Sequence, residues 1–495
     1  MKQARPIGRR FPDYGWAWPS ASLDQLLKAV LLSNDEAAAR LALGWLDSND
    51  IDSASFGEHR LLAALAERHG KRLASHPAYP RMAGLQKMLW SRSRLAYREA
   101  QPILAALGEA GCPVLLLKGA SRIALDAAAQ RGRMSHDIDI LVRPESMRDA
   151  LDLFLAGGWQ GSTGAGPLHL KARIAAFRAL NFFKGSYGDL DLHQYAYHPS
   201  QAAPEDDEGL WRRAERARLV GVDLLVPSPA DRIVLAIGHS GLDAHAHSDW
   251  LVDIDWTVRR GDVDWNVLLD ILRARRLFVP AAVSLSYLGR EVGTPIPDNI
   301  LNRIIDGADR SGLLGRVSIL EAKPRREFGF CSGLARGLAK QLRLWRGVLP
   351  KQGPKDVVWR ARSGRTKPEA REQIASTACA LRVPAEIARN QPVPVMIGIR
   401  IVVPDQRRRF EFELSTEKHH LARLTYRKLD RSSGVRELRF SGTVEVDAAA
   451  EKLTLEARPS RHFRNWDTPE DVARYGPAPF TLISATLGPK AVGWP

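Results

Sequence analysis

The sequence predicts an α+β protein of several domains, and three observations lead to this prediction. The chain of 495 residues is too long for one ordinary hydrophobic core. Apolar residues recur at helical spacing near the N-terminus and at a spacing of two near the C-terminus. Between these regions, short apolar runs alternate with helical segments, which is typical of an α/β core. The expected parts are a helical N-terminal region (1–110), an α/β core (111–227), a helical flank (228–349), a basic linker (350–391) and a β-rich C-terminal domain (392–495).

The helical regions are predicted from periodicity and from helix-start signals. LDQLLKAVLL and HRLLAALAERHGKRLA repeat apolar residues every three to four positions, in a region dominated by Ala, Leu, Arg and Glu. The helical flank has a start signal, with Ser228 as N-cap, Pro229 at the first helical position and Asp231 in the first turn. Helical periodicity continues from there to about Leu349.

The α/β core is predicted from the order of its segments. PVLLLKGAS indicates a buried strand that runs into a turn, and IALDAAAQ indicates a helix. DIDILV indicates a second strand, and SMRDALDLFLAGG a helix that stops at glycine. ALNFFKG and DLDLHQYA then indicate two strands that form a hairpin through Ser186, Tyr187 and Gly188.

The C-terminal domain is predicted from six short runs in which apolar and polar residues alternate, after about Pro392. Turn residues separate the runs, which is typical of an antiparallel sandwich or small barrel. The runs are MIGIRIVV, RRFEFELS, HLARLTYRKL, ELRFSGTVEV, KLTLEA and FTLISATL. The preceding LPKQGPKDVVWRARSGRTKPEAR combines Pro and Gly with many basic residues, so we expect a linker there.

The composition is that of a globular protein with an excess of positive charge. Lys and Arg number 72 against 56 Asp and Glu, a formal net charge of +16, which favours a nucleotide, nucleic acid or another polyanion as partner. Three cysteines without metal-ligand spacing argue against a disulfide framework and a structural zinc site. No apolar run reaches the roughly 18–20 residues that span a bilayer, so we expect a soluble, cytoplasmic protein without membrane contact.

Two aspartates in the second core strand carry the strongest functional signal. Asp137 and Asp139 stand one residue apart in SHDIDILVRPE, beside Ile138 and Ile140. Residues i and i+2 of a strand point to the same face, so the two carboxylates project together, with Cα atoms about 6–7 Å apart. Like charges in apolar surroundings raise each other's pKa and need compensation. Carboxylate oxygens suit Mg²⁺ or Mn²⁺, and two metal ions about 3.5–4 Å apart fit such a pair.

Two neighbouring features favour a metal site over aspartates that simply face solvent at a strand end. Upstream, the apolar strand LLLKGAS breaks at Gly119 and Ser121 just before a helix, and a helix N-terminus with glycine and a hydroxyl is suited to phosphate. Downstream, DLDLH offers a third carboxylate on an alternating strand, which could complete the metal site or accept a proton from an attacking hydroxyl. Both Asp189 and Asp191 are candidates for this carboxylate.

The order of these motifs resembles the polymerase-β-like nucleotidyltransferase superfamily, which pairs a Gly–Ser turn with a D-x-D strand and a third acidic strand. More closely, LLLKGAS, RMSHDIDILV, LDLHQ and the later PSPADRIVLAIGHS are similar to a bacterial family of uncharacterised nucleotidyltransferases. The resemblance covers roughly Leu23 to Phe278 and does not reach the β-rich C-terminus. It implies a polymerase-β-like α/β core with a helical flank.

The resemblance also implies a reaction and the residues for it. A nucleoside triphosphate (NTP) would be the substrate, and Mg²⁺ or Mn²⁺ would assist transfer of its nucleoside monophosphate to an acceptor hydroxyl. The implied nucleotide-binding residues are Lys118, Gly119, Ser121 and Arg133. The implied metal-binding and catalytic residues are Asp137, Asp139 and Asp191. The Leu-His that follows Asp191 favours it over Asp189 as the third carboxylate.

Two other functions stay open. One is a protein that kept the fold but only binds, as a scaffold acting through its C-terminal domain. The other is a metal-dependent phosphohydrolase, for which HSGLDAHAHSDWLVDID offers a cluster of possible ligands: His239, His245, His247, Asp249, Asp253 and Asp255. The spacing is not a known zinc spacing, so the favoured interpretation is that His239 and Asp253 are helix residues that line the cleft and that the other members of the cluster are solvated polar groups.

The acceptor is not specified by the sequence and could be a protein, an RNA or a small molecule. The basic segment 336–371, interleaved with Trp345 and Trp359, could bind nucleic acid, or could be a solvated linker. We expect the C-terminal domain to recognise the acceptor or another partner.

Overall fold

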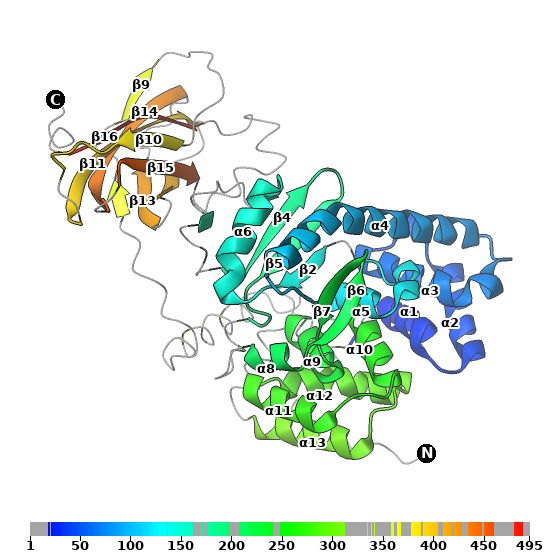
Figure 1. Ribbon diagram of the computed structural model, residues 1–495. Coiled ribbons are helices and arrows are strands. Elements are labelled where there is room, and N and C mark those ends of the chain that lie inside the picture. Colours follow the sequence, from blue (N-terminus) through cyan, green and yellow to red (C-terminus); the bar gives the residue numbers. More distant parts are fainter. Residues whose placement is uncertain are drawn as a thin grey trace. The chain divides into compact units, whose positions relative to one another are not determined.

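In the computed structural model the chain folds as two compact units (Figure 1). The first unit consists of Met1–Ser162 and Arg178–Lys351, and the second of Thr163–Phe177 and Gln352–Pro495. Helices, a mixed sheet and two further sheets are present, which confirms the α+β multidomain class. The residues that the structure describes are 18–19, 21–135, 137–161, 170–171, 174, 177–198, 201, 207–240, 248–311, 334, 338, 341, 358–360, 364–367, 378–387, 390–403, 409–416, 420–427, 434–447, 450–459 and 480–488.

Helices form the start of the first unit. They are α1 (Ala21–Leu31), α2 (Asp35–Ser48), α3 (Phe56–Leu73) and α4 (Tyr79–Glu109), with the short turn η2 (Ile51–Ser53) before α3. Capping residues fix two of the helix starts. The Asn34 side chain accepts hydrogen bonds from the first backbone N–H groups of α2, and Ser55 and Glu58 form a capping box at α3.

A seven-stranded mixed sheet follows, with the strand order β3-β4-β5-β2-β1-β7-β6. Its strands are β1 (Leu115–Leu116), β2 (Ile138–Leu141), β3 (Gln160–Gly161), β4 (Ala179–Lys184), β5 (Gly188–His193), β6 (Glu215–Leu219) and β7 (Val222–Val226). Helix α5 (Lys118–Leu125) and the turn η3 (Ala127–Arg131) lead from β1 to β2, and η4 (Pro144–Ser146) and α6 (Met147–Ala156) follow β2. The predicted segment order is present, although β1 and β2 are antiparallel.

Two hairpins extend this sheet. The predicted hairpin pairs β4 with β5. The hairpin of β6 and β7 was not expected from the sequence. Its turn lies at Val220 and Gly221, which have φ values of 46° and 83°. Two successive residues of positive φ are typical of a hairpin turn, but a β-branched valine in that conformation is uncommon and hides the signal.

Helices complete the first unit. They are α8 (Glu208–Arg212), α9 (Pro229–Ser240), α10 (Asp249–Arg259), α11 (Trp265–Arg275), α12 (Phe278–Tyr287), η7 (Leu288–Val292) and α13 (Asp298–Arg310). Helix α9 begins as predicted, because the hydroxyl of Ser228 accepts a hydrogen bond from the backbone N–H of Asp231. One continuous apolar core joins residues of α1–α3 to residues of α9–α13, so helices that are distant in sequence pack together.

The second unit contains two sheets that share one apolar core. The five-stranded sheet has the order β10-β15-β12-β13-β8, and the four-stranded sheet has the order β16-β11-β14-β9. All six predicted strands are present, as β11 (Pro392–Val403), β12 (Arg409–Ser415), β13 (His420–Arg427), β14 (Gly434–Glu445), β15 (Lys452–Pro459) and β16 (Phe480–Leu487).

The segment 350–391, expected to be a linker, contributes three strands to these sheets, and this part of the expectation is corrected. They are β8 (Val358–Arg360), β9 (Gly364–Lys367) and β10 (Ala378–Arg382). Strand β10 pairs with β15, β8 with β13 and β9 with β14. Strands β8 and β9 are short and lie in the basic run, so their composition resembled a linker. Strand β10 follows that run and has a single basic residue, Arg382. The backbones of all three strands complete the sheets.

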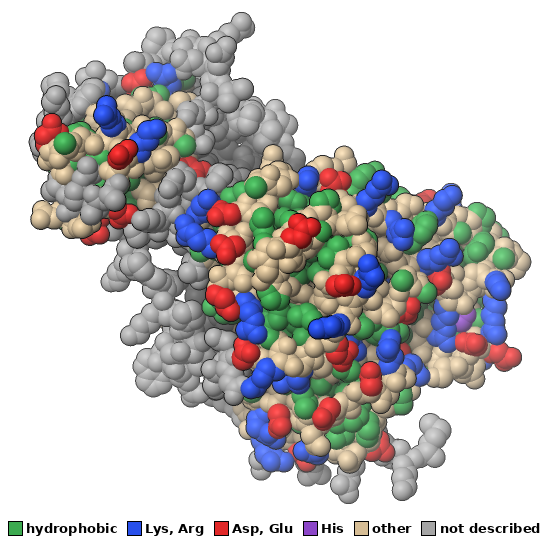
Figure 2. Space-filling view, viewed as in Figure 1, with side chains coloured by type: hydrophobic (Ala, Val, Ile, Leu, Met, Phe, Trp, Pro, Cys, Tyr) green, Lys and Arg blue, Asp and Glu red, His purple; other side chains and the backbone are tan. Residues whose placement is uncertain are grey.

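The excess of positive charge does not gather into one patch on the face shown in Figure 2. There, Lys and Arg side chains are interspersed with Asp and Glu over the described residues. The basic segment 336–371 lies mostly outside the residues that the structure describes, and Trp359 falls in β8. Within the described part of the chain, no helix has the length and apolar character needed to cross a membrane.

Candidate active site

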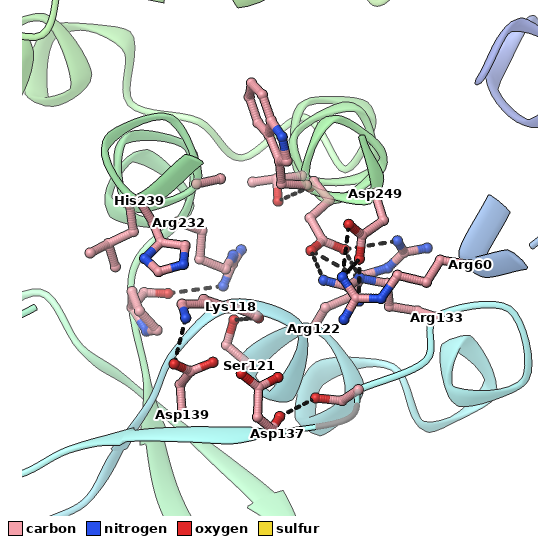
Figure 3. A pocket seen from close by; sticks show the side chains of 18 of the residues that line it. Arg60, Lys118, Ser121, Arg122, Arg133, Asp137, Asp139, Arg232, His239 and Asp249 are labelled. Carbon is pink, nitrogen blue, oxygen red and sulfur yellow. Dashed lines mark hydrogen bonds and ion pairs between the residues drawn. The ribbon is translucent and has the colours of Figure 1, made fainter. Parts of the chain in front are cut away.

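A pocket of about 530 Å³ lies in the first unit, lined by residues of β2, β5, α3, α5, α9 and α10. Its volume is within the range of about 300–1,000 Å³ that is usual for small-molecule sites. Figure 3 shows aspartates of the β2 segment on one side and a group of arginines and aspartates around α10 on another. Asp191 is not part of the lining; the predicted site residues that are part of it are Lys118, Gly119, Ser121, Arg133, Asp137 and Asp139.

Strands β2 and β5 place two of the predicted carboxylates side by side. The strands are parallel, and Asp139 and Asp191 are partners in their register. The leucines and isoleucines that alternate with these aspartates are buried in the core. Because Asp139 is only 2% exposed, its negative charge has to be compensated inside the protein.

His193 lies next to the same two aspartates. Its Nε2 is 3.1 Å from Oδ1 of Asp139. One potential ligand atom from each of Asp139, Asp191 and His193 lies within 4.8 Å of the other two, which is close enough to share a metal ion. This group, found among the described residues, contains His193 where the sequence analysis expected Asp137.

Lys118 supplies a positive charge to Asp139, since its Nζ lies 2.5 Å from Oδ1 of that carboxylate. Burial alone would raise the pKa of Asp139, but the charge of Lys118 and the hydrogen bond from His193 outweigh burial and hold the pKa below its usual range. Lys118 has a φ of 47°, a left-handed conformation that costs a non-glycine residue about 1–3 kcal/mol. The turn into α5 therefore holds a strained lysine against a buried carboxylate.

Asp137 and Asp189 line the pocket and have raised pKa values. Burial, together with the charge of Asp139, raises the pKa of Asp137. Burial also raises the pKa of Asp189 to about 6, although the Asn181 side chain donates a 2.8 Å hydrogen bond that favours the ionised form. A carboxyl group with a pKa near 6 can gain and lose a proton close to neutral pH. In β5, the carboxylate that meets the pocket is thus Asp189.

Gly119 and Ser121 lie in the first turn of α5, at the pocket. A Cβ atom on Gly119 would stand 3.0 Å from Cζ and Nη2 of Arg133, so the missing side chain lets Arg133 approach the backbone. The Ser121 hydroxyl donates a 2.7 Å hydrogen bond to the carbonyl of Lys118 and is almost fully buried. Glycine is therefore needed at position 119 for packing, independently of any role in binding phosphate.

An ion-pair cluster forms another part of the wall. Arg133 contacts both Asp249 and Asp253, each at 2.8 Å. Arg60 pairs with Asp249 at 3.0 Å, and Arg122 pairs with Asp253 at 3.0 Å. The two aspartates are four residues apart in α10 and so lie on one face of it. Three guanidinium groups against two carboxylates leave this wall positively charged.

The segment rich in histidine and aspartate contributes to the pocket through His239 and Asp253, as expected, and also through Asp249. Asp249 and Asp255 are buried, so the expectation that they are solvated is corrected. Burial and the charge of Lys118 lower the pKa of His239 to about 4, so its imidazole is neutral at neutral pH. Asp255 instead binds Arg259 and Thr294. His245 and His247 lie outside the described residues. In the part of this segment that is described, arginines hold the carboxylates of Asp249 and Asp253.

Sequence reasoning missed some residues of the site. His193 had a signal, because it stands two residues after Asp191 on the same alternating strand. No local signal marks the pocket arginines Arg60, Arg122 and Arg232, since they come from α3, α5 and α9 and meet only after folding.

Comparison with known proteins covers this part of the chain. Residues 56–290 match the model of a family described as "Uncharacterised nucleotidyltransferase". The match begins with α3 and ends within η7, so it includes every residue that lines the pocket, and it stops before the strands of the second unit. The resemblance to a nucleotidyltransferase family is confirmed for this region. Neither a curated protein nor a solved structure matches the chain.

Proposed function

From the match of residues 56–290 to a nucleotidyltransferase family, we propose that the protein transfers a nucleoside monophosphate from an NTP to an acceptor hydroxyl, with a divalent metal ion. The observation that supports this best is the gathering of carboxylates at one pocket: Asp137, Asp139 and Asp189 line it, and Asp191 stands beside Asp139. We further propose that the mixed sheet and α5 form a polymerase-β-like core.

The side chains fit a hard divalent cation such as Mg²⁺ or Mn²⁺. Asp139 and Asp191 would hold it, with His193 or Asp137 as a further ligand. Burial raises the pKa of Asp137, and the negative charges of Asp139 and Asp191 raise it further; a bound cation would relieve this unfavourable ionisation. When bound, the ion would polarise phosphate oxygens and neutralise charge on the pyrophosphate leaving group.

The triphosphate is proposed to bind at the start of α5. The first backbone N–H groups of a helix lack intrahelical partners and favour anions. Lys118, at this helix end, adds a full positive charge. Positioning and electrostatic stabilisation would supply most of the rate acceleration, as in other phosphoryl transfers.

The proton of the acceptor hydroxyl is proposed to pass to Asp189. This residue lines the pocket and has a pKa of about 6, which suits a general base near neutral pH. Asp191, which the resemblance favoured, is proposed to act on the metal side, because it pairs with Asp139 and does not line the pocket.

The experiment is transfer of label from an α-³²P-labelled NTP, with Mg²⁺ or Mn²⁺, to protein, RNA and small-molecule fractions of a cell extract. Asp139→Asn should lower transfer by about 10²-fold or more, because a proposed metal ligand is lost and with it electrostatic stabilisation of the transition state. Asp270→Asn removes the same charge from an exposed position on α11 and should behave as wild type. Equal labelling by wild type and Asp139→Asn would refute the assignment. Metal-dependent NTP binding without transfer would identify a binding protein instead.

A further inference from the structure

Among the residues that the structure describes, one cation of the pocket, Arg232, has no carboxylate oxygen closer than 3.7 Å. Five Lys and Arg side chains line the pocket among the described residues. Four of them have a carboxylate oxygen within 3.0 Å: Lys118, Arg60, Arg122 and Arg133. For Arg232, the nearest ion pair is 3.7 Å long and joins its Nη1 to Oε2 of Glu215.

Arg232 is nevertheless buried. It is 8% exposed, and its Nη1 donates a 3.0 Å hydrogen bond to the carbonyl of Pro227, a neutral acceptor. Its Nε is buried and has no acceptor within the described part of the chain. Burial lowers the pKa of Arg232, and the charge of Glu215 does not offset this. A buried guanidinium that lacks a close counterion is unstable relative to water unless an anion joins it.

The position of Arg232 points to where such an anion would lie. Arg232, Leu235, Ala236 and His239 follow one another at helical spacing on α9 and form one wall of the pocket. Figure 3 shows Arg232 and His239 on the opposite side of the pocket from Asp137 and Asp139. His239 is neutral at neutral pH, so it does not add a second charge to this wall.

We propose that Arg232 forms an anion subsite that binds a phosphate group of a substrate, on the side of the pocket away from the β2 aspartates. This rests on the proposed function, because it names a chemical property of what that pocket binds. The phosphate could belong to the triphosphate of the nucleotide or to a phosphorylated acceptor. In both cases the planar guanidinium would donate two hydrogen bonds to phosphate oxygens.

The test is calorimetric titration of the full chain with pyrophosphate, with ATP, and with inorganic phosphate in the presence of saturating ATP. Arg232→Gln should weaken the binding of at least one of these by about tenfold or more, the value of a hydrogen bond to a charged group. If the variant binds ATP and pyrophosphate more weakly, the phosphate at Arg232 belongs to the nucleotide. If it binds only inorganic phosphate more weakly, in the presence of saturating ATP, the phosphate belongs to the acceptor. Arg232→Lys keeps the positive charge but lacks the planar guanidinium, so its affinity for these probes should lie between those of wild type and Arg232→Gln. Arg273→Gln removes the same charge at an exposed site on α11 and should bind all three as wild type does.

A second readout separates ligand binding from a structural role. Without ligand, Arg232→Gln should unfold at the same temperature as wild type or higher, because a poorly compensated buried charge is removed. Pyrophosphate or phosphate should then raise the unfolding temperature of wild type more than that of Arg232→Gln. Affinities unchanged for all three probes, or a marked loss of stability without ligand, would overturn the subsite. The proposed transfer reaction is tested separately, by comparing the labelling of acceptors by wild type and by Asp139→Asn.

Discussion

The ammonium group of Lys118 lies 2.5 Å from the carboxylate of Asp139, an aspartate that is 2% exposed and that is proposed to bind the metal ion. The lysine thus acts as the counterion of Asp139 when no metal is bound. Because Lys118 also begins the helix proposed to bind the triphosphate, its charge is available both to the carboxylate and to an incoming phosphate. Under the proposed function, this pair would connect stability to metal binding and nucleotide binding.

Lys118→Met should lower the free energy of unfolding by about 3 kcal/mol at neutral pH, since breaking a buried pair leaves Asp139 without its cation. The pKa of Asp139 is lowered in the folded protein, so the pair stabilises above the unfolded pKa of about 3.9 and this contribution is lost as pH falls through the folded value. The difference in the free energy of unfolding between wild type and variant should therefore become smaller at acidic pH. Denaturant unfolding measured across pH checks this.

The double variant Lys118→Met with Asp139→Asn is the control for that measurement. It removes both charges, so it should be more stable than Lys118→Met alone. A Lys118→Met protein that unfolds at the wild-type denaturant concentration would show that the pair does not stabilise the fold.

Asp189→Asn should make the metal-free protein more stable at neutral pH. Burial raises the pKa of Asp189 to about 6, above its unfolded value of about 3.9, so ionisation of this group opposes folding. Asparagine mimics the protonated acid and can still accept the hydrogen bond from Asn181. The variant should thus exceed wild type in stability above about pH 6 and equal it below about pH 4. The prediction would be contradicted by a difference in the free energy of unfolding between variant and wild type that does not change with pH, or by a variant that is less stable than wild type at neutral pH.

His193→Gln should weaken metal binding. One of its ring nitrogens lies within 4.8 Å of ligand atoms of both Asp139 and Asp191. Loss of a ligand or of its orienting neighbour lowers metal affinity by about 10–100-fold. Titration with Mn²⁺, followed by electron paramagnetic resonance, measures the change. His76→Gln, outside the pocket, is the control and should keep wild-type affinity; equal affinity in His193→Gln would place the metal elsewhere.

Gly119→Ala should destabilise the protein by about 1–3 kcal/mol, the usual range for overpacking. The new Cβ would stand 3.0 Å from the guanidinium of Arg133, which cannot move freely because Asp249 and Asp253 hold it. Gly84→Ala is the matched control, because Gly84 lies inside α4 and an added Cβ meets nothing within 4 Å. This change should stabilise by about 0.5–1 kcal/mol. Thermal unfolding of both variants decides; equal effects would mean that Arg133 adapts.

Local patterns predicted the elements that local forces determine. The hairpin of β4 and β5 and the six strands β11–β16 were predicted because alternation of side chains is a property of each strand by itself. The hairpin of β6 and β7 was missed because its turn uses a valine at positive φ, and β8 and β9 were missed because short basic strands have the composition of a linker. Such strands become visible only through the partners that complete their hydrogen bonds.

The sequence by itself determined that acidic residues alternate with apolar ones on two strands, and therefore that Asp137 and Asp139, and likewise Asp189 and Asp191, share a face. Only the tertiary structure decided which of them meet: the parallel register pairs Asp139 with Asp191 and His193 joins them, while Asp189 turns out to line the pocket. The same holds for the arginines around the pocket, whose partners stand more than 100 residues away in several cases. Alternation along a strand is fixed by backbone geometry, whereas register and ion pairing depend on the packing of segments that the linear order keeps apart.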